Sequence, residues 1–348
     1  MKEYSPLALV MSAPAVNDLV GYLSDAARRI EASPGAEHVL RFSRRRLDEV
    51  REGFGAAILR GEARLHRLSG LLCDRLFPGQ TEIRCVVIGE AAGDGRRFTL
   101  SQPVSVERLY GLTDLDLGTS ILDNVRWHRN AAWVKADLVA NFVEYQPLQH
   151  NPWGIHKMLS RIKAEEEIWN KVTDEIFQID QLIRRDKKRR ALGRYVKDVF
   201  GLKLVVSDDA EARALAEALA ELCFEVSDIE RHGITPDPTT TSLHLIETKD
   251  YLGLDERKQS GWEAWKMVVG WWDSIFEIQI QPQLNYFLER EQLTSESHAG
   301  FRQRREMLRE EIAREIPLFQ FYQDLLRWLF RGDEEPPRHS NVRVELTD

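Results

Sequence analysis

One stretch of strict alternation constrains the fold most. Residues 276–282 read FEIQIQP. Successive side chains of a β-strand point to opposite faces, so two isoleucines lie on one face and Glu277, Gln279 and Gln281 lie on the other. A surface strand usually carries mixed charges on its polar face, whereas this face carries one carboxylate and two amides. The pattern is compatible with an edge strand that has a solvated face and with a strand that lines a polar cleft.

The composition indicates a folded chain without bulk affinity for nucleic acid. The chain has 348 residues, about the length of two domains, and 43% of them are hydrophobic, which is enough for a packed core. A net charge of -8 gives no support for sequence-independent nucleic-acid binding. The three cysteines are an odd number without metal-ligand spacing, and each lies in an apolar run, so we expect them to pack as small hydrophobic residues in a reducing cytosol. No apolar run approaches the roughly 20 residues that a membrane helix needs, so we expect a cytoplasmic protein.

The first 150 residues carry no catalytic signature. Amphipathic patterns predict helices over residues 16–30, 37–76 and 121–145. A β-hairpin is predicted over residues 83–106, with Asp94-Gly95 as its turn. We therefore expect residues 1–150 to form a helical accessory or interaction domain with one β-hairpin, and a protein partner is one candidate ligand of this domain.

A second pattern follows a proline-containing boundary segment at residues 147–152. A long charged helix or helix pair is predicted over residues 154–190, and an alanine-rich helix over residues 210–223. Strands are predicted over residues 199–206, 224–229, 242–248, 261–269 and 275–281. This order predicts that residues 151–335 form an α+β domain with a mixed sheet of about five strands flanked by helices. Residues 336–348 are predicted to be a mobile polar tail.

Four segments of this second domain combine charged, aromatic and glycine residues in one order. The first is a predicted helix with Arg161-Ile162-Lys163 and then Lys171, and the second is the strand start with Asp198, Gly201 and Lys203. The third is Lys249-Asp250-Tyr251 followed by Lys258 and Gly261-Trp262. The fourth is the alternating strand with Glu277 and Gln279, which Glu296-Ser297-His298 follows.

In this order the segments resemble the synthetase domain of the RelA/SpoT family, over residues 150–335. That family makes (p)ppGpp by transferring pyrophosphate from ATP to the 3′-hydroxyl of GDP or GTP. The resemblance implies a nucleotidyltransferase-like mixed sheet, ATP and a guanine nucleotide as ligands, and Mg²⁺ as cofactor. Pyrophosphoryl transfer is mostly a matter of positioning and of neutralising phosphate charge, which suits the cations and carboxylates of the four segments.

The resemblance also implies a role for each matching residue. Asp198 and Glu277 would hold Mg²⁺, and Glu277 is in addition the candidate base near the attacking hydroxyl. Trp262 stands where the family has a tyrosine that stacks on guanine. The remaining nucleotide-binding candidates are Arg161, Lys163, Lys171, Lys203, Lys258, Gln279 and His298. For the two carboxylates, the alternative is a capping or solvated side chain.

Some positions depart from the family pattern near the expected guanine site. Ala264 and Lys266 stand where the family has serine and histidine, and Gln281-Pro282 stands where it has Arg-Thr. Three functions therefore stay open: (p)ppGpp synthesis, transfer to another acceptor such as another nucleotide or a tRNA 3′ end, and nucleotide binding without catalysis. The chain contains no His-Asp dipeptide, so the family's metal-dependent hydrolase domain is not expected.

Overall fold

The chain folds into two compact units that are not consecutive in sequence. The computed structural model describes residues 14–91, 97–129, 132–162, 168, 172–173, 199–252, 263–295, 317–331 and 335–348. Unit 1 comprises Met1–Ile58, Lys163–Val199 and Gln292–Asp348, and unit 2 comprises Leu59–Ile162 and Phe200–Glu291. Residues 147–152, the predicted domain boundary, connect two paired strands of one sheet in unit 2.

Unit 1 pairs two strands from opposite ends of the sequence and packs helices beside them. Its elements are α2 (Pro14–Ala32), β1 (His38–Ser43), the first part of α3 (Arg44–Leu76), α12 (Pro317–Arg331) and β11 (Val342–Thr347). The strands β1 and β11 are parallel. Helix α2 buries a stripe that includes Val16, Leu19 and Leu23, the spacing of one helix face. The tail predicted to be mobile therefore contains a paired strand.

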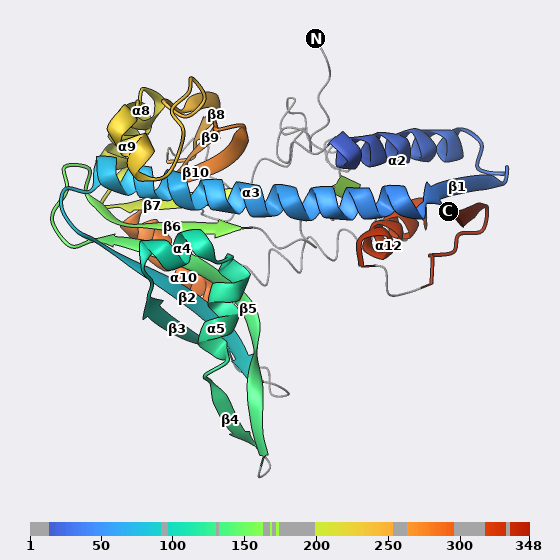
Figure 1. Cartoon of the computed structure of the whole chain (residues 1–348), viewed down its shortest axis with the longest axis horizontal. Helices are drawn as coiled ribbons and strands as arrows, with labels where there is room; N and C mark the ends of the chain where they lie inside the picture. Colours follow the sequence, from blue (N-terminus) through green and yellow to red (C-terminus); the bar gives the residue numbers. More distant parts are fainter. Residues whose placement is uncertain are drawn as a thin grey trace. The chain divides into compact units, whose positions relative to one another are not determined.

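Unit 2 is built on one large mixed sheet. Its strands are β2 (Thr81–Ala91), β3 (Arg97–Pro103), β4 (Arg126–Arg129), β5 (Ala132–Pro147), β6 (Ile155–Ile162), β7 (Phe200–Val206), β8 (His244–Asp250), β9 (Trp265–Trp271) and β10 (Ser274–Pro282). Their order is β3-β2-β5-β6-β7-β10-β9-β8, and β4 pairs with the first part of β5 (Figure 1). Only β7 and β10 are parallel among these pairs. The predicted α+β class with a mixed sheet is confirmed, although the sheet has nine strands instead of about five.

Helices accompany this sheet in unit 2. They are the second part of α3, α4 (Val106–Gly111), α5 (Asp114–Leu122), α8 (Asp209–Ala220), α9 (Val226–Arg231) and the part of α10 (Gln283–Ser295) up to Glu291. Asp208 caps α8 by accepting hydrogen bonds from the amides of Ala210 and Glu211. Helix α8 packs against β7, β9 and β10. On the apolar side of those strands, the ring of Phe276 lies 6.1 Å from that of Phe200 and 6.3 Å from that of Trp271.

Several predicted elements are wrong, and the sheet explains why. Residues 121–145, predicted as a helix, contain the strand β4 and most of the strand β5. Their branched and aromatic residues suit a strand that has neighbours on both sides, which β2 and β6 provide. Arg161 lies on β6 instead of on a helix, and α9 replaces the strand predicted at residues 224–229. The hairpin of β2 and β3 is confirmed, and β3 with its proline is an edge strand as predicted.

None of the described helices is long and apolar enough to cross a membrane.

Candidate functional site

The alternating strand β10 lies inside the sheet, between β7 and β9. Both of its faces are buried, so the interpretation as an edge strand with a solvated face is wrong. Glu277 is only 5% exposed and Gln281 is fully buried. Residue 276 pairs with residue 200, so the N-terminal ends of the parallel strands β7 and β10 lie side by side. A carboxylate kept from water at this central position requires polar partners.

Three lysines and one amide form a row across four neighbouring strands. Lys203 of β7 pairs with Gln279 of β10, which in turn pairs with Lys266 of β9, and Lys266 pairs with Lys249 of β8. Residues directly opposite each other in a sheet point to the same face, and adjacent strands lie about 4.8 Å apart. We call Lys203, Gln279, Lys266 and Lys249 the lysine row. It concentrates positive charge on the face that carries Glu277.

Each lysine of the row forms an ion pair with a carboxylate. The pairs are Lys203 with Glu289 of α10 at 2.8 Å, Lys266 with Glu277, and Lys249 with Glu247. These lysine side chains are between one fifth and about one quarter exposed, so solvent still reaches them. An anionic ligand on this face would therefore compete with carboxylates for cations that are already in place.

Glu277 receives donors on both carboxylate oxygens. The ammonium group of Lys266 lies against Oε2, and Nε2 of Gln279 donates to Oε1 at 2.6 Å. On the neighbouring strand, the residue opposite Glu277 is Gly201, and the residue opposite Gly201 is the exposed Arg161. A Cβ atom at Gly201 would lie in ordinary van der Waals contact with the backbone oxygen of Arg161, at 3.9 Å, so this position has room for a small side chain.

Helix α10 covers one end of this face. Its Tyr286 is buried, and the ammonium groups of Lys157 and Lys203 lie 5.4 and 5.8 Å from the centre of the tyrosine ring. Such distances allow cation–π attraction. Lys157 also pairs with Glu144 at 3.2 Å, across the strands β6 and β5. The face thus combines cations, carboxylates and an aromatic ring.

The structure brings the described candidates together on one face and leaves the other candidates to prediction. Arg161, Lys203, Gln279 and Glu277 share this face through the strand register. The candidates outside the described residues are Asp198, Lys163, Lys171, Lys258, Trp262 and His298. In the Lys-Asp-Tyr segment, Asp250 pairs with Arg213 of α8 at 2.9 Å, which fixes the end of β8 on that helix.

Sequence reasoning missed two groups of polar residues in unit 2. His232 looks isolated in the sequence. In the structure its Nδ1 forms a hydrogen bond with the Tyr110 hydroxyl at 2.6 Å, and its Nε2 lies 3.0 Å from Oδ2 of Asp74. The hydrogen bond from His232, together with the charges of His232 and Arg231, holds the pKa of Asp74 below its usual value. The second group is Glu62, His66 and Asp114. The only local signal for it is that Glu62 and His66 are four residues apart on a helix.

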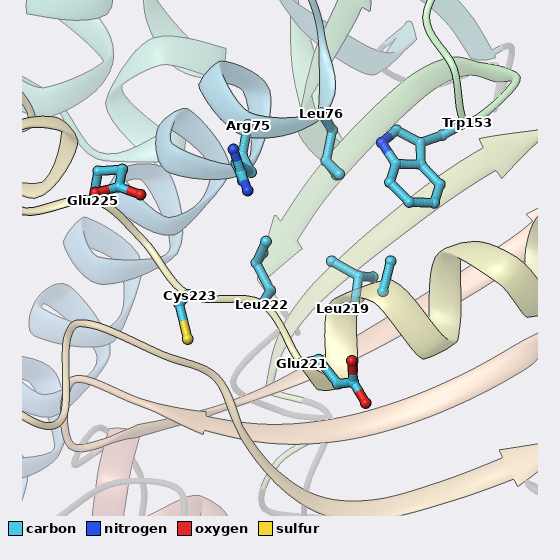
Figure 2. Close-up of a pocket in the computed structure, with 9 residues that line it drawn as sticks. Arg75, Leu76, Trp153, Leu219, Glu221, Leu222, Cys223 and Glu225 are labelled. Carbon is cyan, nitrogen blue, oxygen red and sulfur yellow. The ribbon is translucent and has the colours of Figure 1, made fainter.

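A surface cavity of about 460 Å³ lies elsewhere in unit 2. Figure 2 shows its lining, which includes Arg75, Trp153, Leu219 and Cys223. None of the candidate site residues lines it. The lysine row and this cavity therefore lie at different places on unit 2.

Comparisons with known proteins find likeness in structure only. No family model and no curated protein matches the chain. The small alarmone synthetase 1 from Bacillus subtilis is 16% identical, with a TM-score of 0.28 over 53% of this chain and 78% of that chain. The same synthetase bound to its product pppGpp is 17% identical, with a TM-score of 0.27 over 51% and 82% of the two chains. The small alarmone synthetase 2 from Bacillus subtilis is 16% identical, with a TM-score of 0.27 over 53% and 83%.

Proposed function

We propose that the lysine row binds nucleotide phosphates and that the chain is a RelA/SpoT-like pyrophosphotransferase, which moves pyrophosphate from ATP to the 3′-hydroxyl of GDP or GTP. The observation that carries the proposal is the row itself, with Lys203, Lys266 and Lys249 beside the buried Glu277. A cross-strand row of ammonium groups matches a chain of phosphates, because lysine binds phosphate as a compact positive charge.

The reaction requires neutralisation of charge and removal of one proton. The 3′-oxygen of the acceptor bonds to the β-phosphorus of ATP, the bond from that phosphorus to the bridging α–β oxygen breaks, and AMP leaves. Negative charge collects on the phosphate oxygens, where Lys203 and Lys266 would offset it. Glu277 would accept the proton of the hydroxyl. Its two neighbours on the carboxylate oxygens would hold the carboxylate in place until the acceptor arrives.

Phosphate binding and base function are coupled through one ion pair. Lys266 contacts Glu277, so a phosphate that draws Lys266 away also uncovers the Oε2 atom of the carboxylate. The amide of Gln279 still holds the other oxygen at 2.6 Å. Binding of the donor nucleotide would thereby expose the base, which limits proton abstraction to the complex with nucleotide.

Mg²⁺ needs more oxygen ligands than the described residues offer on this face. Both oxygens of Glu277 already have donors, and hard divalent cations require several oxygen ligands. The described residues by themselves therefore do not fit a Mg²⁺ site. The other carboxylates beside the lysine row, Glu247 and Glu289, pair with lysines as well. A further carboxylate is therefore required, and Asp198, which lies outside the described residues, is our candidate for it.

A second candidate function is nucleotide binding without transfer. The observation that favours it is again the contact of Lys266 with Glu277, because a carboxylate that stays paired can neither take a proton nor bind a metal ion. The position of Lys266 is also one at which the sequence departs from the RelA/SpoT pattern. In this case the lysine row would serve a sensor or an interaction protein.

One experiment separates these functions. Purified full-length protein is incubated with labelled ATP and a panel of acceptors that includes GDP, GTP, other nucleotides and tRNA, and the products are resolved by chromatography. We expect AMP and a pyrophosphorylated guanosine. Release of AMP with another acceptor would identify that acceptor, and ATP binding in equilibrium dialysis without any AMP would establish the second candidate. Absence of both binding and transfer would overturn the proposal.

Glu277→Gln tests the base, and Glu144→Gln is its matched control. Both glutamates are mostly buried and each pairs with a lysine on a neighbouring strand of the same sheet. We expect Glu277→Gln to lose at least about 100-fold in transfer rate while it still binds ATP, since removing a general base typically costs 10²–10⁴-fold. The control should retain its rate. Full activity of Glu277→Gln would rule out the role given to Glu277.

A further inference from the structure

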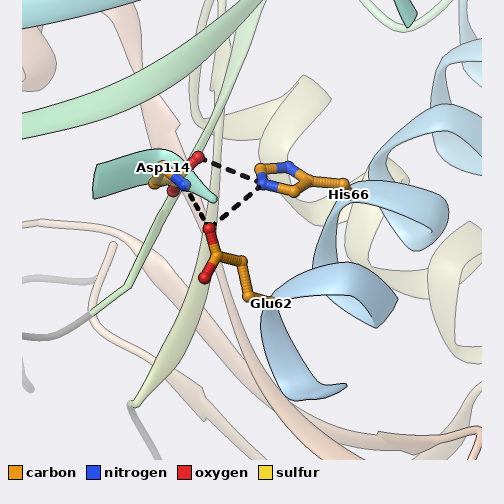
Figure 3. Close-up of side chains that lie close together, drawn as sticks. All are labelled: Glu62, His66 and Asp114. Atoms are coloured by element: carbon orange, nitrogen blue, oxygen red, sulfur yellow. Dashed lines mark hydrogen bonds and ion pairs between the residues drawn. The ribbon is translucent and has the colours of Figure 1, made fainter. Parts of the chain in front are cut away.

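Three titratable side chains meet in the core of unit 2. Glu62 and His66 lie one turn apart on α3, and Asp114 is the first residue of α5. Figure 3 shows the three side chains pointing toward one another. Their exposed fractions are 6%, 2% and 6%. We call them the Glu-His-Asp cluster. Burying three such groups together costs free energy unless their charges are balanced.

The distances suit ligands of one small metal ion. Nε2 of His66 lies 3.1 Å from Oδ1 of Asp114 and 3.9 Å from Oε1 of Glu62. One potential ligand atom from each residue lies within 4.8 Å of the other two. A tetrahedral ion with bonds of about 2.1 Å separates its ligands by roughly 3.4 Å, and the distances from Nε2 of His66 to the two carboxylates lie within about half an ångström of that value.

The orientation of the His66 ring requires a proton or a metal ion at Nε2. The other ring nitrogen, Nδ1, lies 3.5 Å from the hydroxyl of Tyr145, and Nε2 faces the two carboxylates. A bare Nε2 lone pair would repel these carboxylates, so either a proton or a metal ion has to lie there.

A proton alone does not balance the charges of the cluster. One imidazolium offsets one of the two carboxylates, and among the described residues no lysine or arginine pairs with Glu62 or Asp114. In addition, Oδ2 of Asp114 is buried and has no hydrogen-bond partner within the described part of the chain. An unpartnered carboxylate oxygen inside a protein is unusual and calls for a ligand. A divalent ion would balance both carboxylates and leave the imidazole neutral.

We propose that the Glu-His-Asp cluster binds a divalent transition-metal ion of the zinc type. The donor set decides the class, because Mg²⁺ and Ca²⁺ prefer ligands that are all oxygen, whereas imidazole suits zinc and its neighbours. The Tyr145 hydroxyl near Nδ1 matches the outer partner that a metal-bound histidine usually has. This inference does not depend on the proposed function.

The contacts around the cluster indicate a structural ion. The backbone amide of Asp114 donates to Glu62, and the side chain of Asn141 on β5 donates to the carbonyl of Asp114. An ion bound to Glu62, His66 and Asp114 would thus fasten the start of α5 to α3, beside β5. Since all three side chains are buried, a substrate has no access to the ion.

Zinc binding by the full-length protein tests the proposal. The protein is treated with a chelator, dialysed, and titrated with Zn²⁺, and bound metal is measured by mass spectrometry after gel filtration. We expect one Zn²⁺ per chain and a midpoint of thermal unfolding that rises with zinc concentration, because an ion that binds only the folded state stabilises it. Mg²⁺ at the same concentration should produce neither effect.

Conservative variants assign the bound ion to the cluster. Asp114→Asn and Glu62→Gln keep the size of each side chain and remove one ligand charge, so we expect each to lose stoichiometric zinc. Asp74→Asn is the matched control, since Asp74 belongs to another His–Asp pair of the same unit. It should still bind one zinc ion. Circular dichroism of the metal-free variants tests whether each one is folded. If one variant is unfolded, zinc binding by the other variant decides.

Two results would overturn the proposal. One is a folded wild-type protein that binds no stoichiometric zinc, which would leave the cluster as a protonated ion pair network. The other is zinc binding that both cluster variants retain, which would place the ion elsewhere in the chain.

Discussion

Lys266 and Glu277 show how one ion pair can serve both stability and function. They lie on neighbouring strands, and the carboxylate is almost completely buried while the lysine keeps some contact with water. Removing one partner of such a pair leaves a charge that the interior does not solvate. The same pair holds the proposed base in its covered state. Stability measurements and activity measurements therefore report on the same contact.

Loss of Lys266 should destabilise unit 2 through Glu277. We expect Lys266→Met to lower the free energy of unfolding by about 3 kcal/mol, since it leaves a buried carboxylate without its cation. The double variant Lys266→Met, Glu277→Gln should regain most of this loss, because the remaining amide is neutral. Urea unfolding of the wild type, both single variants and the double variant measures the coupling. If the changes in unfolding free energy of the two single variants simply added up in the double variant, Lys266 and Glu277 would not be coupled as a buried ion pair.

Asp74 should stabilise unit 2 in a way that depends on pH. Its pKa is lowered in the folded state by His232 and Arg231, from an ordinary value of 3.8. The stabilisation is therefore present above pH 3.8 and is lost as the pH falls through the lower folded-state value. We expect Asp74→Asn to be less stable than the wild type at pH 7 and nearly equal to it at the lowest pH at which both stay folded. A difference that does not shrink with acid would contradict this linkage.

At the scale of elements, two glycines of α3 differ in what surrounds them. A Cβ atom at Gly61 would overlap the ring of Phe200, whereas a Cβ atom at Gly55 has no neighbour within 4 Å. Gly61 thus lets the sheet's β7 approach the helix, and Gly55 has no such role. Both glycines cost the helix about 1 kcal/mol relative to alanine.

Alanine substitutions at these two positions should have opposite effects. We expect Gly55→Ala to raise the free energy of unfolding by about 1 kcal/mol, through helix propensity alone. Gly61→Ala gains the same propensity but forces Phe200 to move, and overpacking costs about 1–3 kcal/mol, so the variant should be less stable than the wild type. Denaturant unfolding compares the two, and equal shifts for both variants would argue against the contact of Gly61 with Phe200.

Sequence patterns predict elements well where one period dominates. The strict alternation of residues 276–282 locates β10, and the capped alanine-rich segment locates α8. Residues 132–147 also satisfy a helical spacing, and they become a strand because β2 and β6 offer partners on both sides. Local sequence does not contain those partners. Such an element is decided by tertiary contacts.

The candidate site is also predictable from local sequence only in part. Glu277 and Lys203 are predictable because the residue type and its place on a strand are local properties. The lysine row is not, since the register of three strand pairs brings Lys249 beside Lys266. The Glu-His-Asp cluster joins residues 62 and 114 only through the packing of α5. Residues that lie far apart in sequence and have ordinary types give no signal before folding.

For the whole molecule, the C-terminal strand should matter for unit 1 alone. β11 is the only described partner of β1, and Asn341 donates to the carbonyl of Pro34 nearby. We expect deletion of residues 335–348 to remove hydrogen-exchange protection from the amides of β1. The amides of β7 and β10 should keep their protection, as they belong to unit 2. Unchanged exchange in β1 would show that its order does not depend on β11.

The pairing of β1 with β11 also has a consequence for how a new chain is made. Arg41 and Glu345, which pair across these strands at 3.1 Å, are 304 positions apart. At about 5–20 residues per second, a ribosome needs roughly 15 to 60 s to supply the partner of β1. All strands of unit 2 leave the ribosome earlier, so unit 2 can fold during translation. Until β11 has been made, β1 has an open edge at which other chains can pair.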